Sequence, residues 1–155
     1  MQPSQEPLGL LVAAIRRSVK AMVMRKVEPL GQAPLQFWLL IGALEVPAAS
    51  QADLARRLRL DEPSVSRAVA ALVRKGLLKA QRDQADRRRV LLVLTSDGQA
   101  LAATLAPIAA EVRGAVESPL EPEEREVVRR ALVRVAGRLR EHDQADLPVA
   151  AATAP

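Results

Sequence analysis

The side chains best suited to chemistry in this sequence are arginines and small hydroxyl-bearing residues, and they gather between residues 50 and 90. That segment holds eleven Lys and Arg against five Asp and Glu, while the whole chain of 155 residues has a formal net charge of +5. A localised basic patch is the electrostatic footprint of a phosphate-binding surface. On charge alone, a solvated face of a folded protein explains the patch equally well.

Arginines dominate the polar stretch 82–89, which lies between two short β-like runs, 77–81 and 90–94. Two short strands around a charged tip predict a β-hairpin with an extended loop. Guanidinium groups suit the narrow minor groove of DNA, whose negative potential attracts them. Asp83 and Asp86 stand among the arginines, and we expect at least one of them to pair with an arginine and fix the loop. The candidate DNA contacts in this loop are Arg82, Arg87, Arg88 and Arg89.

Helical periodicity over residues 62–75 gives a second set of candidates, because one face is apolar and the other combines arginine, serine and alanine. Alanine permits close approach, serine can bond a base edge or a phosphate, and arginine can bond a guanine edge at two points. We therefore predict a DNA-recognition helix in which Arg67 contacts a base and Arg74 the phosphate backbone. The candidate contacts on this helix are Pro63, Ser64, Ser66, Arg67, Ala70 and Arg74.

Two capped helices must position these residues. Ser50 and Asp61 are good N-caps for helices over 51–58 and 62–75, and Gly76 can close the second helix. Two helices joined by a short turn and followed by a hairpin match a winged helix-turn-helix. The start of the first of these helices could also hold a phosphate beside Ser50 and Gln51, since its free amides favour an anion.

Longer helices flank this middle segment, so the predicted fold class is mainly α with a small two-stranded β wing. Apolar residues at steps of three and four predict helices over 8–27, 96–116 and 122–141, and Pro107 predicts a kink or a break. Their stripes could form a three-helix bundle within one chain, but we favour packing across a twofold axis. The predicted organisation is an N-terminal dimerisation helix (1–32), a winged helix-turn-helix DNA-binding domain (33–95), C-terminal dimerisation helices (96–143) and a disordered tail (144–155).

Composition excludes several classes of function. The sequence has no cysteine, which removes thiolate zinc sites, redox motifs and cysteine nucleophiles, and its single histidine, His142, has no partner histidine. No stretch approaches a membrane span, and the start does not resemble a signal peptide. We therefore expect a cytoplasmic protein that is not an enzyme, with no catalytic residues, metal, cofactor or membrane partner.

The ordered set of motifs resembles the MarR family of bacterial transcriptional regulators over roughly residues 8–142. Asp86-Arg87-Arg88, followed by Val90 to Thr95 and Gly98, resembles the family's wing motif, Asp-x-Arg, and the Leu-Thr-x-x-Gly that follows it. The resemblance implies that Arg88 is the wing arginine in the minor groove and that Asp86 braces the wing. Three further segments match. Residues 51–55 resemble the family's first helix-turn-helix element, and residues 72–77 resemble the end of its recognition helix. Gln36-Phe37 resembles its second-helix signature.

The resemblance also implies partners. The family is an obligate homodimer on an inverted repeat, a pseudo-palindromic operator in double-stranded DNA whose half-sites lie about one helical turn apart. It is usually a repressor released by a small ligand, which commonly binds between the dimerisation helices and the winged helix. With only two aromatic residues in the chain, an effector pocket here would be mostly aliphatic. The candidate pocket residues are Leu11, Ile15, Phe37 and Trp38.

Two departures from the family pattern are visible. Gln32-Ala33 stands where the family commonly has Leu followed by Ser or Thr, so the second helix lacks its usual cap. The absence of cysteine excludes the thiol-oxidation mode of some relatives.

An alternative function is a winged-helix protein-interaction or assembly module without specific DNA binding. Apolar or acidic residues on the outer face of the 62–75 helix would favour it, and the arginines found there favour DNA instead.

Overall fold

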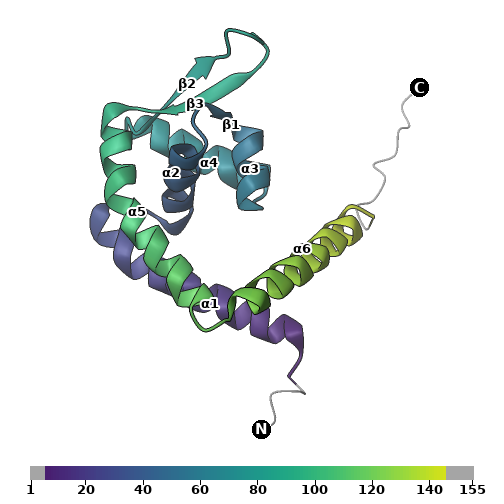
Figure 1. Ribbon diagram of the computed structural model, residues 1–155. Helices are drawn as coiled ribbons and strands as arrows, with labels where there is room; N and C mark the ends of the chain where they lie inside the picture. The colour runs from purple at the N-terminus through teal and green to yellow at the C-terminus, as the bar shows by residue number, and fades with distance from the viewer. Residues whose placement is uncertain (1–5, 146–155) are drawn as a thin grey trace, which may run out of the picture. The chain divides into compact units, whose positions relative to one another are not determined.

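The computed structural model describes residues 6–145 as a mainly helical chain with one small sheet (Figure 1). The chain divides into two compact units after Arg113. In the predicted tail, residues 144 and 145 belong to the last helix, and residues 146–155 lie outside the described residues. The elements are α1 (Leu8–Val27), η1 (Glu28–Leu30), α2 (Pro34–Glu45), β1 (Ala49–Ser50), α3 (Gln51–Leu58), α4 (Glu62–Arg74), β2 (Leu78–Arg82), β3 (Val90–Leu94), α5 (Ser96–Glu117) and α6 (Pro122–Ala145).

Helix α2 lies at the centre of the first unit, where it contacts α1, α3, α4 and β3 (Figure 1). Its apolar residues point in nearly every direction, and Phe37, Leu39 and Leu40 are fully buried. A helix can be apolar all round only if each side is covered by a neighbour, so α2 is the buried central helix of this unit. The rest of this core is aliphatic, as expected for a chain with so few aromatic residues.

The sheet has three antiparallel strands in the order β1-β3-β2, one more than the two-stranded wing that the sequence predicts. β2 and β3 form the predicted hairpin, with Leu78 opposite Leu94 and Arg82 opposite Val90. The additional strand, β1, places Ala49 opposite Leu92 and Ser50 opposite Leu91. Two residues are too short to show strand alternation, so no local pattern predicts β1. Its effect is to attach the start of α3 to the base of the wing.

Helix α5 begins against the turn that ends α4. The Thr95 hydroxyl donates to the Gly76 carbonyl at 2.6 Å and accepts from the Gly98 amide at 3.0 Å. The Thr95 amide donates to the Leu77 carbonyl at 3.1 Å. Gly76 has a φ of +70°, the left-handed conformation expected at a helix end. Leu77 and Gly98 approach so closely that a Cβ on Gly98 would lie 1.9 Å from the Leu77 carbonyl oxygen.

Helices α1 and α6 bury few of their apolar side chains, whereas α5 buries Ala102, Leu105, Ala109 and Val112. α1 buries Val23 and Val27 near its C-terminal end, and Lys26 forms an ion pair with Glu111 of α5 at 2.8 Å. The sequence predicts a kink or a break at Pro107. α5 continues through this residue, so the helix does not break there. No helix within residues 6–145 is long and apolar enough to cross a membrane. The exposed apolar residues are Leu8, Leu10, Leu11, Val12 and Ile15 on α1, and Val127, Val128, Leu132, Val133, Val135 and Leu139 on α6.

The contact at Gly98 makes a prediction for stability. Gly98→Ala should lower the free energy of unfolding by about 2 kcal/mol or more, because the new methyl group collides with backbone and cannot be relieved by a rotamer change. Gly114→Ala in the same helix is the matched control, since a Cβ there meets nothing within 4 Å. It should stabilise the helix by up to about 1 kcal/mol. Urea unfolding measures both, and equal stabilities for the two variants would contradict the packing described.

Candidate DNA-binding interface

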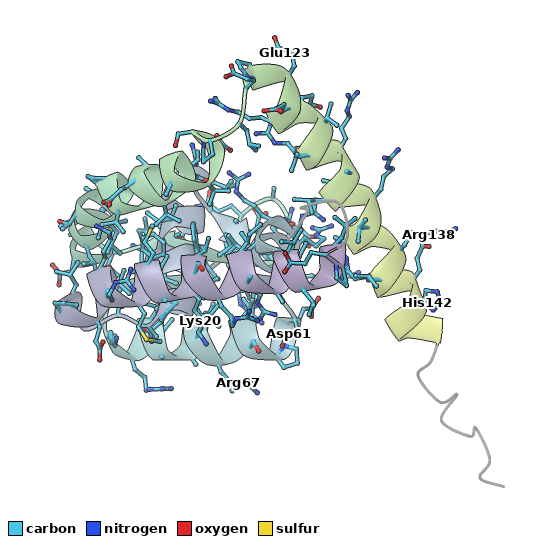
Figure 2. The ribbon with its side chains drawn as sticks, turned by 90° about the horizontal axis from the view of Figure 1, so that it is seen from below. Lys20, Asp61, Arg67, Glu123, Arg138 and His142 are labelled. Atoms are coloured by element: carbon cyan, nitrogen blue, oxygen red, sulfur yellow. The ribbon has the colours of Figure 1, made fainter. Side chains whose placement is uncertain are left out.

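Helix α4 has one buried face and one exposed face, as its periodicity predicts. Val65, Ala68, Val69 and Leu72 are buried in the core of the first unit. On the opposite face Pro63, Ser66, Arg67, Ala70 and Arg74 are exposed, and Ser64 is half-buried. The predicted contact residues of this helix therefore share one surface, and Figure 2 shows Arg67 extending away from the ribbon.

The first turn of α4 is fixed by hydrogen bonds that also orient Arg67. The Asp61 carboxylate accepts the Ser64 amide at 2.8 Å, as an N-cap does, and this bond lowers the pKa of Asp61. The Arg67 guanidinium donates to the Ser64 hydroxyl at 3.2 Å. A guanidinium carries five N–H donors, so most of those on Arg67 remain for another acceptor.

The wing loop is braced by backbone amides. The Asp86 carboxylate accepts the Arg88 amide at 3.0 Å, and the Asp83 carboxylate accepts the Ala85 amide at 2.9 Å. Within the part of the chain that the structure describes, neither carboxylate forms an ion pair with an arginine, so that expectation is wrong. An aspartate reaches the amide two residues on at little entropic cost, which favours this turn over a pair with a long side chain. Arg82, Arg87 and Arg88 are exposed on the wing.

The start of α3 carries a reciprocal cap built by Ser50 and Asp53. The Ser50 hydroxyl accepts the Asp53 amide at 3.1 Å, while the Asp53 carboxylate accepts the Ser50 hydroxyl at 2.7 Å and the Ser50 amide at 3.1 Å. The bonds from the Ser50 hydroxyl and amide, reinforced by Arg56, lower the pKa of Asp53 from 3.8 to about 2. Ser50, a predicted phosphate contact, is thus already engaged by a carboxylate. Gln51 is the first residue of α3, and its backbone amide stays a predicted phosphate contact.

The Asp53 carboxylate also holds two arginines. Arg56 of α3 pairs with its Oδ1, and Arg89 of the wing pairs with its Oδ2 at 3.0 Å. Arg89 is therefore set apart from the other predicted wing contacts, because its guanidinium faces α3. The cap is predictable from neighbouring residues, whereas no local pattern marks a partner 36 residues away.

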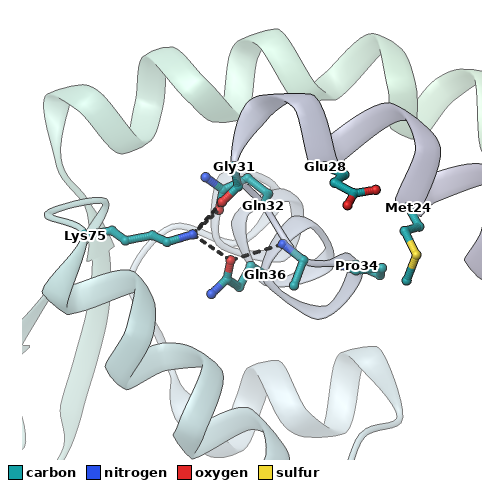
Figure 3. A pocket seen from close by; sticks show the side chains of 8 residues that line it. Met24, Glu28, Gly31, Gln32, Pro34, Gln36 and Lys75 are labelled. Carbon is teal, nitrogen blue, oxygen red and sulfur yellow. Dashed lines mark hydrogen bonds between the residues drawn. The ribbon is translucent and has the colours of Figure 1, made fainter.

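A pocket of about 460 Å³ lies beside the end of α4 (Figure 3). At one wall the Lys75 ammonium donates to the Gly31 carbonyl at 2.6 Å and to the Gln36 side chain at 2.9 Å. The same Gln36 oxygen accepts the Ala33 amide at 3.2 Å, which replaces the N-cap that the sequence lacks. The lining residues are Met24, Glu28, Gly31, Gln32, Ala33, Pro34, Gln36 and Lys75.

The four residues predicted for an effector pocket do not line this one. Phe37 is fully buried in the core, and Trp38 packs edge-to-face against it with ring centroids 4.7 Å apart. Leu11 and Ile15 lie on the exposed part of α1. The structure therefore packs the two aromatic rings against each other, whereas Leu11 and Ile15 are exposed on α1.

An exposed arginine-bearing helix, a braced basic wing and the capped helix before them define a winged helix-turn-helix of the DNA-binding class. A model of the MarR family matches residues 32–89. The chain also resembles three solved structures at 26% identity each. BpsR of Bordetella bronchiseptica, whose DNA binding is regulated by 6-hydroxynicotinic acid, has a TM-score of 0.71 over 88% of this chain and 96% of that one. MepR of S. aureus in complex with DNA has a TM-score of 0.74 over 87% and 99%.

The third structure is a MarR transcriptional regulator from Methanosarcina mazei, with a TM-score of 0.68 over 86% of this chain and 96% of that one. These comparisons support the predicted resemblance to the MarR family of winged-helix transcriptional regulators. They likewise support DNA binding and a role in transcription regulation.

The lowered pKa of Asp53 predicts how stability depends on pH. A carboxyl group whose pKa is lower in the folded state stabilises the fold above its unfolded pKa and loses that contribution as the pH falls through the folded value. The wild type should therefore be more stable than Asp53→Asn at pH 6, and the difference should shrink as the pH falls from about 4 towards about 2. Urea unfolding of both proteins across this range measures it. A difference that stays constant with pH would contradict the assignment.

Proposed function

We propose that the chain is a homodimeric, ligand-responsive repressor that binds an inverted repeat in double-stranded DNA in the cytoplasm. The observation that carries this proposal is the two-faced α4, whose inner face is buried and whose outer face presents Arg67 and Arg74. No acidic residue stands on that helix between Pro63 and Lys75. Such a surface favours DNA over a protein partner, because its long side chains are arginines and its apolar groups are small.

The major groove is the proposed place of α4. Pro63, Ser64, Ser66 and Ala70 keep the helix narrow enough for close approach, and the serines supply short hydrogen-bonding groups. Arg67 sits one turn into the helix, where a recognition helix meets the base edges. Arg74, two turns further on, suits a phosphate of the backbone.

The minor groove is the proposed place of the wing. Asp86 holds the amide of Arg88, so the loop displays the Arg88 side chain from a fixed backbone. Arg82 and Arg87 add positive charge on either side of the tip, where phosphates approach. The amide of Gln51 at the start of α3 would hold one further phosphate.

Exposed apolar side chains on α1 and α6 support the homodimer. Leu8, Leu10 and Ile15 of α1 are each more than half exposed, as are Val135 and Leu139 of α6. Contiguous apolar surfaces of this kind mark sites of association. A second copy of the chain would cover both helices in a closed twofold arrangement, and such a dimer presents its two α4 helices to an inverted repeat.

Regulation by a small ligand is supported by the similarity to BpsR, whose DNA binding responds to 6-hydroxynicotinic acid. In this chain Trp38 is the half-buried aromatic residue that such a ligand could reach, with Leu11 and Ile15 of α1 as predicted aliphatic neighbours. Phe37 would act from within the core by supporting the Trp38 ring.

Selection from a pool of random duplexes tests the proposed function. The full chain should enrich sequences that contain an inverted repeat with half-site centres about 10 base pairs apart, since α4 from each protomer must enter successive major grooves on one side of the DNA. Sequencing of the bound pool measures the spacing. Enrichment of a single unpaired site, or no enrichment at all, would contradict a homodimer on a palindrome.

The wing assignment makes its own prediction. Arg88→Ala should weaken binding to the selected duplex by about tenfold or more, because it removes a guanidinium from the minor groove while leaving the Asp86 brace on the backbone amide. Arg140→Ala, which removes the same charge from α6, is the control and should bind nearly as the wild type does. Fluorescence anisotropy gives the affinities and circular dichroism the fold. A folded Arg88→Ala protein with wild-type affinity would refute the assignment.

A further inference from the structure

One ion pair joins the wing to the helix-turn-helix, and its position suggests a role that neither residue has alone. We propose that Asp53 and Arg89 form a strut between α3 and the wing, and that this strut positions the wing for the minor groove. Arg89 is then a positioning residue that acts through Asp53, not a residue that touches DNA. The inference rests on the proposed DNA-binding function, which it deepens.

The strut lies where the wing loop meets the sheet. Arg89 Nη2 is 3.0 Å from Asp53 Oδ2, and the two side chains are 50% and 30% exposed. Asp53 is in the first turn of α3, directly after β1, whose Ser50 pairs with Leu91 of β3. Strand pairing thus fixes the base of the wing against α3, and the ion pair fixes Arg89, the residue directly before β3.

The Asp53 carboxylate is held in place by groups other than Arg89. It accepts the amide and hydroxyl of Ser50, and Arg56 holds the other carboxylate oxygen. Exposed ion pairs are usually weak because two long side chains must be ordered. Here the short partner is already held by its cap, so only Arg89 loses freedom when the pair forms.

The Arg89 side of the strut is linked directly to the wing loop. The Arg89 amide donates to the Asp86 carbonyl at 2.9 Å, and the Arg89 carbonyl accepts the Asp83 amide at 3.0 Å. The same residue therefore closes the loop with its backbone and attaches to α3 with its side chain. Any shift of Arg89 relative to Asp53 must move the loop that carries Arg87 and Arg88.

The proposal predicts an unusual direction for the change in DNA affinity when a carboxylate is neutralised. A carboxylate on a DNA-binding surface repels phosphates, so removing one should strengthen binding if it has no other role. Glu62 provides that comparison, because it is exposed in the first turn of α4 and forms no ion pair within residues 6–145. If Asp53 is part of a strut, its neutralisation should instead weaken binding. The two carboxylates should thus respond in opposite directions.

The experiment compares Asp53→Asn, Arg89→Gln, the double variant and the control Glu62→Gln in the full chain. Each is titrated against the selected duplex and against a scrambled duplex of equal length. Asp53→Asn and Arg89→Gln should each weaken specific binding by about threefold to tenfold. The double variant should bind no more weakly than the worse single variant, because the effects of substituting two partners in one interaction do not add. Glu62→Gln should bind equally or more tightly. Hydroxyl-radical footprints should lose protection only at the outer minor grooves.

The possible failures are distinguishable. Tighter binding by Asp53→Asn would overturn the strut, and so would weaker binding confined to Arg89→Gln, which would mean that Arg89 contacts DNA itself. A wild type that does not distinguish the two duplexes would overturn the proposed function. In that event amide hydrogen exchange of the free protein still tests the strut: both single variants should speed exchange at the Asp83 and Arg89 amides by the same factor. Unchanged exchange would overturn it.

Discussion

The close packing of Gly98 on the Leu77 carbonyl is the constraint on which the geometry of the DNA-binding surface depends. At this one place α4 ends, the hairpin begins and closes, and α5 starts. Thr95 reinforces it by bonding to Gly76 and Leu77 on one side and to Gly98 on the other. Because a glycine lets two backbones touch, the direction in which α5 starts is fixed relative to α4 and the wing hairpin by main chain, not by side chains that could repack.

The core explains why so short a segment can hold this arrangement without a set of large aromatic residues. α2 places Phe37, Leu39 and Leu40 at the centre, and aliphatic side chains from every neighbouring element pack around them. A core of this kind gains its cohesion from many small contacts that must be closely fitted. The inner residues of α4, such as Val65 and Leu72, belong to the same core, so the recognition surface is held by what lies beneath it.

Local signals in the sequence predict most of the elements. Ser50, Asp61 and Gly76 mark helix ends through bonds or backbone angles that involve only near neighbours, and the structure confirms each. The periodicity of α4 likewise separates its buried and exposed faces. These features are predictable because their partners lie within about one helical turn along the chain.

The features that the sequence does not predict join distant residues. Arg89 meets Asp53, Lys75 meets Gly31 and Gln36, and β1 pairs with β3, and in each case more than 35 residues separate the partners. No periodicity or cap marks such a pairing. The wing aspartates differ from the prediction for another reason: charge complementarity predicts arginine partners, but a nearby backbone amide is the donor that each carboxylate reaches more easily.

The division of α4 into two faces has an evolutionary consequence. The residues that hold the helix in place and those that would read DNA are different sets, and substitutions at exposed positions usually change stability by less than about 0.5 kcal/mol. Pro63, Ser66, Arg67 and Ala70 can therefore vary while the fold persists. Gene duplication followed by changes at these few codons would give a paralogue with a new target sequence, without first requiring a more stable scaffold.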